Sequence, residues 1–238
     1  MLAVVSPAAY WTAVAVAAAG CGLLCSEARR QPGAWTTIAA RALGALLVAD
    51  AAVYAASNLV SGYSVASSLP LSLCDVAALV AAAACWWPIP VLVELTYFWG
   101  LAGTLQAVFT PDVRTPFPHL AFLEYVAGHL GIVVAAIFLV IGLGHRPRPG
   151  AVPRVFTITA CYTAFVGVVD AVTGADYMFL RHPPSEWTLL RVLGPWPWYV
   201  ASAAGVAIVL LLVLDSPFWA ERRRSHQPLF HPVRPHGA

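Results

Sequence analysis

The sequence predicts an all-α integral membrane protein in which about seven transmembrane helices form one bundle. Of the 238 residues, 60% are hydrophobic and only 10% are charged, a balance that soluble domains of this size do not show. Apolar blocks of about 18 to 25 residues, each long enough to cross about 30 Å of hydrocarbon, alternate with short joints that hold Pro, Gly or Arg. We therefore expect a transmembrane domain over residues 1–220. The polar segment 221–238 is expected to be a disordered cytoplasmic tail.

The predicted helices follow the apolar blocks in order. They cover about residues 8–25, 35–56, 70–86, 89–109, 119–143, 155–172 and 200–215. A turn with Arg29, Arg30, Pro32 and Gly33 separates the first two helices, because Pro and Gly interrupt a helix. The segment between the second and third helices carries no charge, which suits the outer face of a membrane.

The third predicted helix starts near Pro70. Proline is favoured in a first turn because the N–H that it lacks has no partner there, and Ser68 is a suitable cap. The fourth helix ends at a Pro-rich joint, and the fifth begins between His119 and Glu124. Glycines inside these blocks predict places where two helices approach closely. They are Gly100, Gly103, Gly128 and Gly131.

The arginines predict the orientation of the bundle. When the joints are counted alternately, one side carries Arg29, Arg30, Arg146, Arg148, Arg154, Arg222, Arg223, Arg224 and Arg234, and the other carries Arg114, Arg181 and Arg191. Basic residues are retained on the cytoplasmic side. The N-terminus is therefore expected outside and the C-terminus inside. Trp and Tyr clusters at 86–87 and 196–199 are typical of interface belts.

Several ionisable residues lie within the apolar blocks, where each costs a few kcal/mol unless it is paired, neutralised or wetted. They are Asp50, Cys74, Asp75, Glu94, Glu124, His129 and Asp170. The carboxyl groups either hydrogen-bond across helices in a neutral form or line a polar path. The five cysteines are scattered and form no C-x-x-C, and one histidine lies well inside a helix. This pattern indicates neither a disulfide framework, nor a zinc site, nor a bis-histidine haem, so we expect no metal and no cofactor.

Cys74 and His129 form a candidate catalytic pair. A thiol in the first turn of a helix and near an imidazole becomes a better nucleophile, although a buried cysteine is more often an inert apolar residue. Cys74 is expected about 6 Å below Pro70, and His129 about 7 to 8 Å below Glu124 if that residue marks the interface. Asp75 points about 100° away from Cys74 around the helix. We expect it to pair with another helix.

The chain resembles the YwaF-like bacterial membrane proteins, a family similar to the animal transmembrane protein 164. The resemblance lies between residues 69 and 199, in the stretches LPLSLCD (69–75), GTLQA (103–107), TPD (110–112), FPH (117–119) with His129, DYMFL (176–180) and LGPWPWY (193–199). Two positions depart from the family pattern: Ser72 stands where a histidine is usual, and Asp176 where an asparagine is usual.

The resemblance implies a phospholipid acyltransferase whose nucleophile corresponds to Cys74 and whose histidine corresponds to His129, in a site open to the outer leaflet. The candidate supporting or substrate-binding residues are Asp75, Gln106, Asp112, His119, Asp170, Asp176, Tyr177, Trp196 and Trp198.

We thus expect a lipid-active acyltransferase or acyl hydrolase of a cell membrane, most simply the bacterial plasma membrane. Its partner is a membrane lipid such as a phospholipid or lysophospholipid, and no nucleic acid is expected. Two alternatives stay open. One is a small-solute or proton-coupled transporter with Asp50, Glu94, His129 and Asp170 along its path. The other is a membrane scaffold without enzymatic activity.

Overall fold

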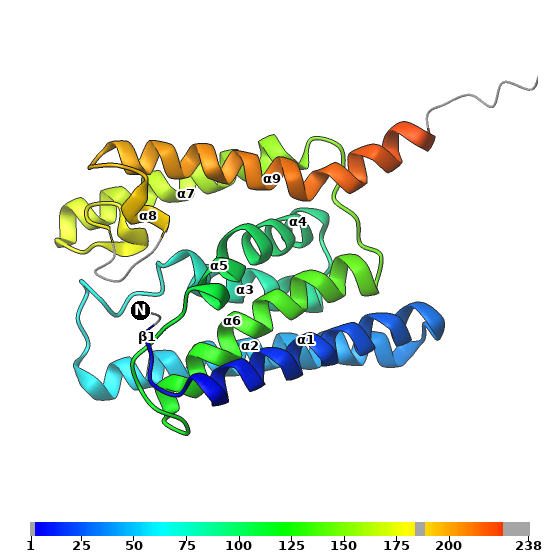
Figure 1. Cartoon of the computed structure of the whole chain (residues 1–238), viewed down its shortest axis with the longest axis horizontal. Coiled ribbons are helices and arrows are strands. Elements are labelled where there is room, and N and C mark those ends of the chain that lie inside the picture. Colours follow the sequence, from blue (N-terminus) through cyan, green and yellow to red (C-terminus); the bar gives the residue numbers. More distant parts are fainter. Residues whose placement is uncertain (1–2, 184–188, 226–238) are drawn as a thin grey trace, which may run out of the picture.

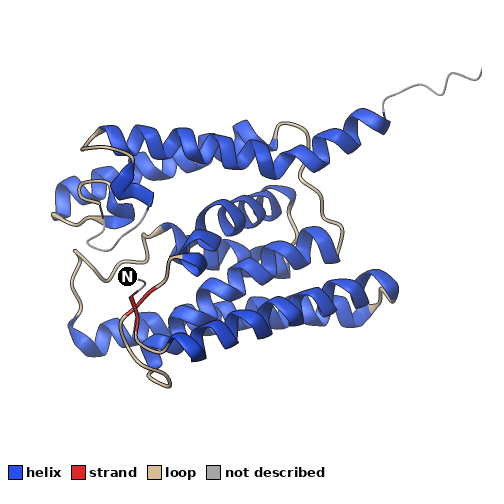
Figure 2. Cartoon of the chain, in the orientation of Figure 1, coloured by secondary structure: helices blue, strands red, loops and turns tan. Residues whose placement is uncertain are grey.

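The protein is a bundle of long helices that run back and forth along one axis (Figures 1 and 2). The computed structural model describes residues 3–183 and 189–225. Its helices are α1 (Pro7–Arg30), α2 (Ala34–Gly62), α3 (Leu73–Trp86), α4 (Pro90–Phe98), α5 (Leu105–Phe109), α6 (Leu120–Ile137), α7 (Ala151–Thr173), α8 (Leu189–Val192) and α9 (Trp198–Ser225). The expected all-α bundle is confirmed.

Two π-helical turns continue these helices. The turn η1 (Trp99–Thr104) joins α4 to α5, so that residues Pro90–Phe109 form one long helix, and η2 (Phe138–Gly142) extends α6. Within the described residues, six helices are long and apolar enough to cross a membrane. The helix α3, which corresponds to the third of the seven predicted transmembrane helices, has 14 residues. It measures about 21 Å and is therefore shorter than a hydrocarbon core of about 30 Å.

The start of α3 differs from the expectation. The helix begins at Leu73 and not near Pro70, and its cap is Ser72 and not Ser68. The main-chain N–H of Ser72 donates to the carboxylate of Asp75 at 3.2 Å. With Asp75 three residues after the cap, this bond completes a capping box. Because α2 also runs on to Gly62, the connector before α3 comprises residues 63–72.

The helix α3 lies at the centre of the bundle and packs against α2, α4, α6 and η1. Its buried side chains are small, namely Ala77, Ala78, Ala81, Ala82, Ala84 and Cys85, and small side chains let neighbouring helices approach. The predicted close contacts at glycine are confirmed at three positions. A Cβ atom would lie 2.9 Å from Ala136 at Gly100, 2.7 Å from Asp50 at Gly128 and 2.8 Å from Leu47 at Gly131.

A short parallel pair of strands, which the sequence did not predict, ties the N-terminal segment to the joint before α6. Strand β1 (Ala3–Val4) pairs with β2 (Asp112–Val113). The Tyr10 hydroxyl adds a hydrogen bond of 2.9 Å to the Val108 carbonyl. Both contacts lie at the end of the bundle where α1 begins (Figure 1).

Ion pairs hold the opposite end of the bundle. The Glu94 carboxylate is 1% exposed and pairs with Arg148 at 2.9 Å and with Arg154 at 2.6 Å. This pairing raises the pKa of Arg148 above its ordinary value. Glu94 is therefore a charged partner of two arginines, which corrects the expectation of a neutral carboxyl or a path-lining group.

The last helix continues beyond its expected end at Asp215. It passes through Pro217 and includes residues 221–225, the first part of the expected tail. The remainder of that tail, 226–238, lies outside the described residues. Arg222, in this part of α9, pairs with Asp215 of the same helix at 2.6 Å.

Candidate functional site

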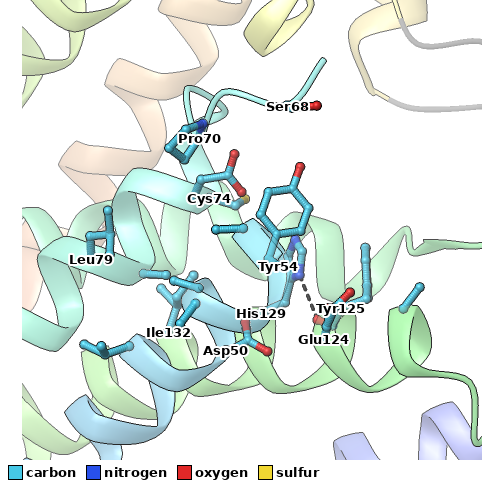
Figure 3. Close-up of a pocket in the computed structure, with 18 residues that line it drawn as sticks. Asp50, Tyr54, Ser68, Pro70, Cys74, Leu79, Glu124, Tyr125, His129 and Ile132 are labelled. Atoms are coloured by element: carbon cyan, nitrogen blue, oxygen red, sulfur yellow. Dashed lines mark hydrogen bonds between the residues drawn. The ribbon is translucent and has the colours of Figure 1, made fainter. Parts of the chain in front are cut away.

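A cavity of about 560 Å³ lies between α2, α3 and α6, next to the connector 63–72 (Figure 3). Most of its wall is apolar. The side chains that give it chemistry are Asp50, Tyr54, Cys74, Asp75, Glu124 and His129. Val48 and Leu79, which also line it, are exposed apolar residues of two helices within the bundle. Exposed apolar side chains beside a cavity suit a hydrocarbon environment better than water.

Cys74 is the second residue of α3, in the first turn of the helix. Its half-buried thiol lines the cavity. The Sγ atom accepts a hydrogen bond from the Thr104 hydroxyl at 3.8 Å. The N-terminal end of a helix carries a partial positive charge, which favours an anion such as a thiolate.

His129 enters the same cavity from α6 and is oriented by its own helix. Its Nδ1 atom lies 2.8 Å from the Tyr125 carbonyl oxygen, shown as the dashed line in Figure 3. A carbonyl only accepts, so Nδ1 carries the proton, and Nε2 of the neutral ring keeps a lone pair. The ring also stacks on Tyr125 at a centroid distance of 4.1 Å. His129 is thus held in the tautomer that a general base requires.

The structure brings Cys74 and His129 to one cavity, as the depth estimate predicts. Among the described residues it records no hydrogen bond between the thiol and the imidazole; the recorded partners are Thr104 for Cys74 and Tyr125 for His129. Proton transfer between them therefore needs a bridging group, such as a water or a substrate atom, or a small movement of either side chain.

Asp75 lines the cavity but does not have the expected partner. Its carboxylate accepts the Ser72 N–H of its own helix, which corrects the expectation that it pairs with another helix. The spacing of Ser72 and Asp75 is a local signal for a capping box and is visible in the sequence.

Asp50 and Glu124 are cavity residues that the candidate list omits. Asp50 lies on α2 against Gly128, where a Cβ atom would be 2.7 Å from its Oδ2. Glu124 accepts a hydrogen bond of 2.9 Å from the Ser57 hydroxyl. Both were recognisable as ionisable residues inside apolar blocks, which is the signal that marks functional positions in membrane helices.

Two of the predicted supporting residues fix the connector that leads to Cys74. Buried Asp170 accepts the Tyr177 N–H at 3.0 Å. The Tyr177 hydroxyl then donates to the Val65 carbonyl at 2.8 Å and accepts the Leu69 N–H at 2.9 Å. Asp170 and Tyr177 therefore act on the position of α3 and do not line the cavity.

Three more predicted residues belong to the segment around the 3₁₀ turn η3 (Tyr177–Phe179) and the start of α9. Asp176 accepts the Arg181 and His182 main-chain N–H groups at 2.8 and 3.1 Å. The Trp196 indole donates to the Leu180 carbonyl at 3.1 Å, and Trp198 is exposed. These residues shape one end of the bundle and lie outside the cavity wall.

Gln106 and His119 lie apart from the cavity. Gln106 donates to the Ala102 carbonyl of its own helix at 3.2 Å, and His119 caps α6 by accepting the Ala121 N–H. Asp112 belongs to β2, and its side chain lies outside the described part of the structure. No group of three or more His, Cys, Asp or Glu side chains suited to a metal occurs among the described residues.

Of the comparisons with known proteins, one gives a match, and that match covers most of the chain. No curated protein and no solved structure matches it. A family model described as the TMEM164 family matches residues 4–215, a range that includes every residue of the cavity wall. With six apolar helices of membrane-spanning length among its described residues, the chain is a multi-pass membrane protein. It belongs to the TMEM164 family.

Proposed function

We propose that the protein is a lipid-active acyltransferase or acyl hydrolase in which Cys74 is the nucleophile and His129 is the general base. The observation that carries the proposal is that both residues line the wall of one largely apolar cavity. His129 is there in the tautomer that leaves Nε2 unprotonated. A fatty acyl chain fits such a wall, and the exposed apolar residues at its border give a route for a lipid from the membrane.

The chemistry follows from these two side chains. His129 Nε2 takes the thiol proton through a bridging water or after a small movement of either side chain, and Cys74 Sγ attacks the ester carbonyl of a membrane phospholipid. The ester C–O bond breaks, the His129 imidazolium returns the proton to the leaving oxygen, and a thioester forms on Cys74. A lysophospholipid hydroxyl or a water then attacks the thioester, His129 takes its proton, and the thiol is restored.

The first turn of α3 supplies hydrogen-bond donors for the oxyanion of each step. The N–H groups of Leu73 and Cys74 have no acceptor among the residues that the structure describes. First-turn amides have no partner inside their own helix. Donors of this kind stabilise a tetrahedral intermediate when they point to the developing negative charge.

In this proposal α3 is the seventh crossing of the membrane, completed by the connector 63–72. The cavity then lies in the outer half, because Cys74 and the connector belong to the end of the bundle that carries few arginines. The substrate is a lipid of the outer leaflet of a cell membrane, and the arginine-rich end faces the cytoplasm.

Intact-mass spectrometry tests covalent catalysis. The purified protein is incubated with vesicles of an ester-linked phospholipid, with and without lysophospholipid, and its mass is recorded. We expect an increase by one fatty acyl group that neutral hydroxylamine removes, as a thioester requires. The adduct should be lost in Cys74→Ala and kept in Cys85→Ala, a matched control because buried Cys85 is on the same helix and outside the cavity wall.

The base is tested with His129→Gln. Loss of a general base lowers the rate by about 10²- to 10⁴-fold, so the adduct should form more slowly at neutral pH while its maximum amount is unchanged. His145→Gln, at the opposite end of the bundle, is the control. No adduct in the unmodified chain, together with lipid turnover that is equal in Cys74→Ala, would reject the proposed chemistry.

A further inference from the structure

The Thr104 hydroxyl differs from four other threonine hydroxyls in or at the end of the long helices. Thr96, Thr110, Thr159 and Thr173 each donate to the carbonyl four residues earlier, at 2.7 to 2.8 Å. This local bond is the ordinary one for threonine in a helix. Thr104 is 1% exposed and donates instead to another helix, at the Sγ atom of Cys74.

The π turn η1 explains this difference. At its end the Leu105 N–H donates to the Gly100 carbonyl, five residues earlier, and this carbonyl is the acceptor that the Thr104 hydroxyl would use in a regular helix. The extra residue in the turn rotates Thr104 relative to the rest of the helix. Such π turns occur frequently at functional sites.

Helix packing holds the π turn next to Cys74. A Cβ atom at Gly100 would lie 2.9 Å from Ala136 of α6, and one at Gly103 would lie 3.4 Å from Leu73, the residue before Cys74. Gly100 therefore lets η1 approach α6 closely, and Gly103 places η1 in contact with the first turn of α3. The close approach fixes where the Thr104 hydroxyl meets the thiol.

We propose that Thr104 is a positioning residue that orients the Cys74 sulfur and favours its thiolate form by donating a hydrogen bond to it. The inference deepens the proposed function and rests on Cys74 being its nucleophile. A hydrogen bond from a hydroxyl stabilises a charged acceptor more than a neutral one. It therefore offsets part of the cost of a thiolate in an apolar wall.

Other titratable groups around the thiol act in addition to Thr104 and are unchanged by its substitution. They are Asp50 and Tyr54 of α2, Asp75 of α3, Tyr162 of α7, and Glu124, Tyr125 and His129 of α6. The carboxylates oppose a thiolate by charge repulsion. A donor next to the sulfur is correspondingly important.

Thiol alkylation tests the inference without any lipid chemistry. The full chain in detergent or lipid discs is treated with iodoacetamide over a range of pH, and the Cys74 peptide is followed by mass spectrometry. In Thr104→Val we expect the Cys74 rate at neutral pH to fall about tenfold and the pH profile to move to higher pH. Thr104→Ser, which keeps the hydroxyl, should restore both.

Thr96→Val is the matched control. Thr96 is 0% exposed and lies on the same long helix, but its hydroxyl bonds to the Leu92 carbonyl. We expect this variant to leave the Cys74 profile unchanged. If Thr104→Val does not fold, Thr104→Ala is compared with Thr104→Ser in its place.

Two results would overturn the inference: equal profiles for the Val and unmodified chains, or a Ser variant that behaves like the Val variant. Failure of the proposed function is distinguishable from these. In that case no acyl adduct forms on Cys74, whereas the alkylation profile still depends on Thr104.

Discussion

The Tyr177 hydroxyl joins two distant parts of the chain. It donates to the Val65 carbonyl and accepts the Leu69 N–H. These bonds fix the connector up to three residues before Ser72, the cap of α3. Burial raises the pKa of this hydroxyl above its ordinary value, so the group stays protonated and keeps its donor at physiological pH. Together with Asp170, which accepts the Tyr177 N–H, it fixes the connector that leads to Cys74.

Tyr177→Phe removes both hydrogen bonds and leaves two main-chain groups of the connector without their partner. Each bond contributes about 1 kcal/mol, so we expect unfolding to become easier by about 2 kcal/mol, measured by denaturant titration. Tyr63→Phe, on the exposed part of the same connector, should change stability little. A Tyr177→Phe variant as stable as the unmodified chain would contradict this account.

At the level of single residues the sequence predicted two side chains that line one cavity, Cys74 and His129, and missed their hydrogen-bond partners. Cys74 and His129 stand out as ionisable residues in apolar blocks at compatible depths. The bond from Thr104 to the thiol was not predictable, because it depends on a π turn that helix packing stabilises. The capping-box spacing of Ser72 and Asp75 indicates the true partner of Asp75, so the expectation of a partner on another helix was wrong.

At the level of elements, the order of the helices was predictable and some of their ends were not. Hydrophobic periodicity identifies apolar blocks, but the start of α3 also depends on bonds from Tyr162 and Tyr177, about 90 to 110 residues further along the chain. The same applies to the β1–β2 pair, whose strands are about 110 residues apart. Such long-range contacts leave no local pattern in the sequence.

The contact between η1 and α6 gives a prediction about element packing. In Gly100→Ala the new methyl group would lie 2.9 Å from the Ala136 Cβ and 3.4 Å from Ile132. Both neighbours are buried, so the helices must move apart. Overpacking of this kind costs about 1 to 3 kcal/mol, and we expect the unfolding midpoint in denaturant to fall accordingly.

Gly20→Ala is the control for this change, because a Cβ at Gly20 of α1 would meet no described atom within 4 Å beyond the neighbouring backbone of its own helix. Alanine is the better helix former by about 1 kcal/mol, so this variant should be as stable as the unmodified chain or slightly more stable. Equal effects at the two glycines would show that helix propensity, and not the close contact, governs Gly100.

At the level of the whole molecule, the ionisable groups of the membrane helices are divided among separate places. Asp50 and His129 line the cavity. Glu94 pairs with two arginines at the opposite end of the bundle, and Asp170 is buried against the Tyr177 main chain. A polar path through all four, as a transporter would need, is not formed by the described residues.

The two terminal parts of the described chain contact the joints at opposite ends of the helix formed by α6 and η2. Strand β1 pairs with β2 in the joint before α6, so the N-terminal segment lies on that side. At the other end, Arg222 of α9 donates to the Pro147 carbonyl, and Arg146 pairs with Glu221, so the end of α9 lies beside the joint after η2. Residues Leu120–Gly142 between the two joints form a candidate membrane span.

If this span crosses the membrane, the two ends of the chain lie on opposite faces, which requires an odd number of crossings and makes α3 the seventh. The excess of arginines at this end predicts that the end of α9 faces the cytoplasm. A tag added at the N-terminus should therefore be removed by protease from intact cells, whereas a tag after residue 238 should be removed only after lysis. Protection of both tags, or removal of both, would mean that the two termini lie on the same face and that α3 does not cross the membrane. In that case β1 and β2 would lie on opposite faces and could not pair.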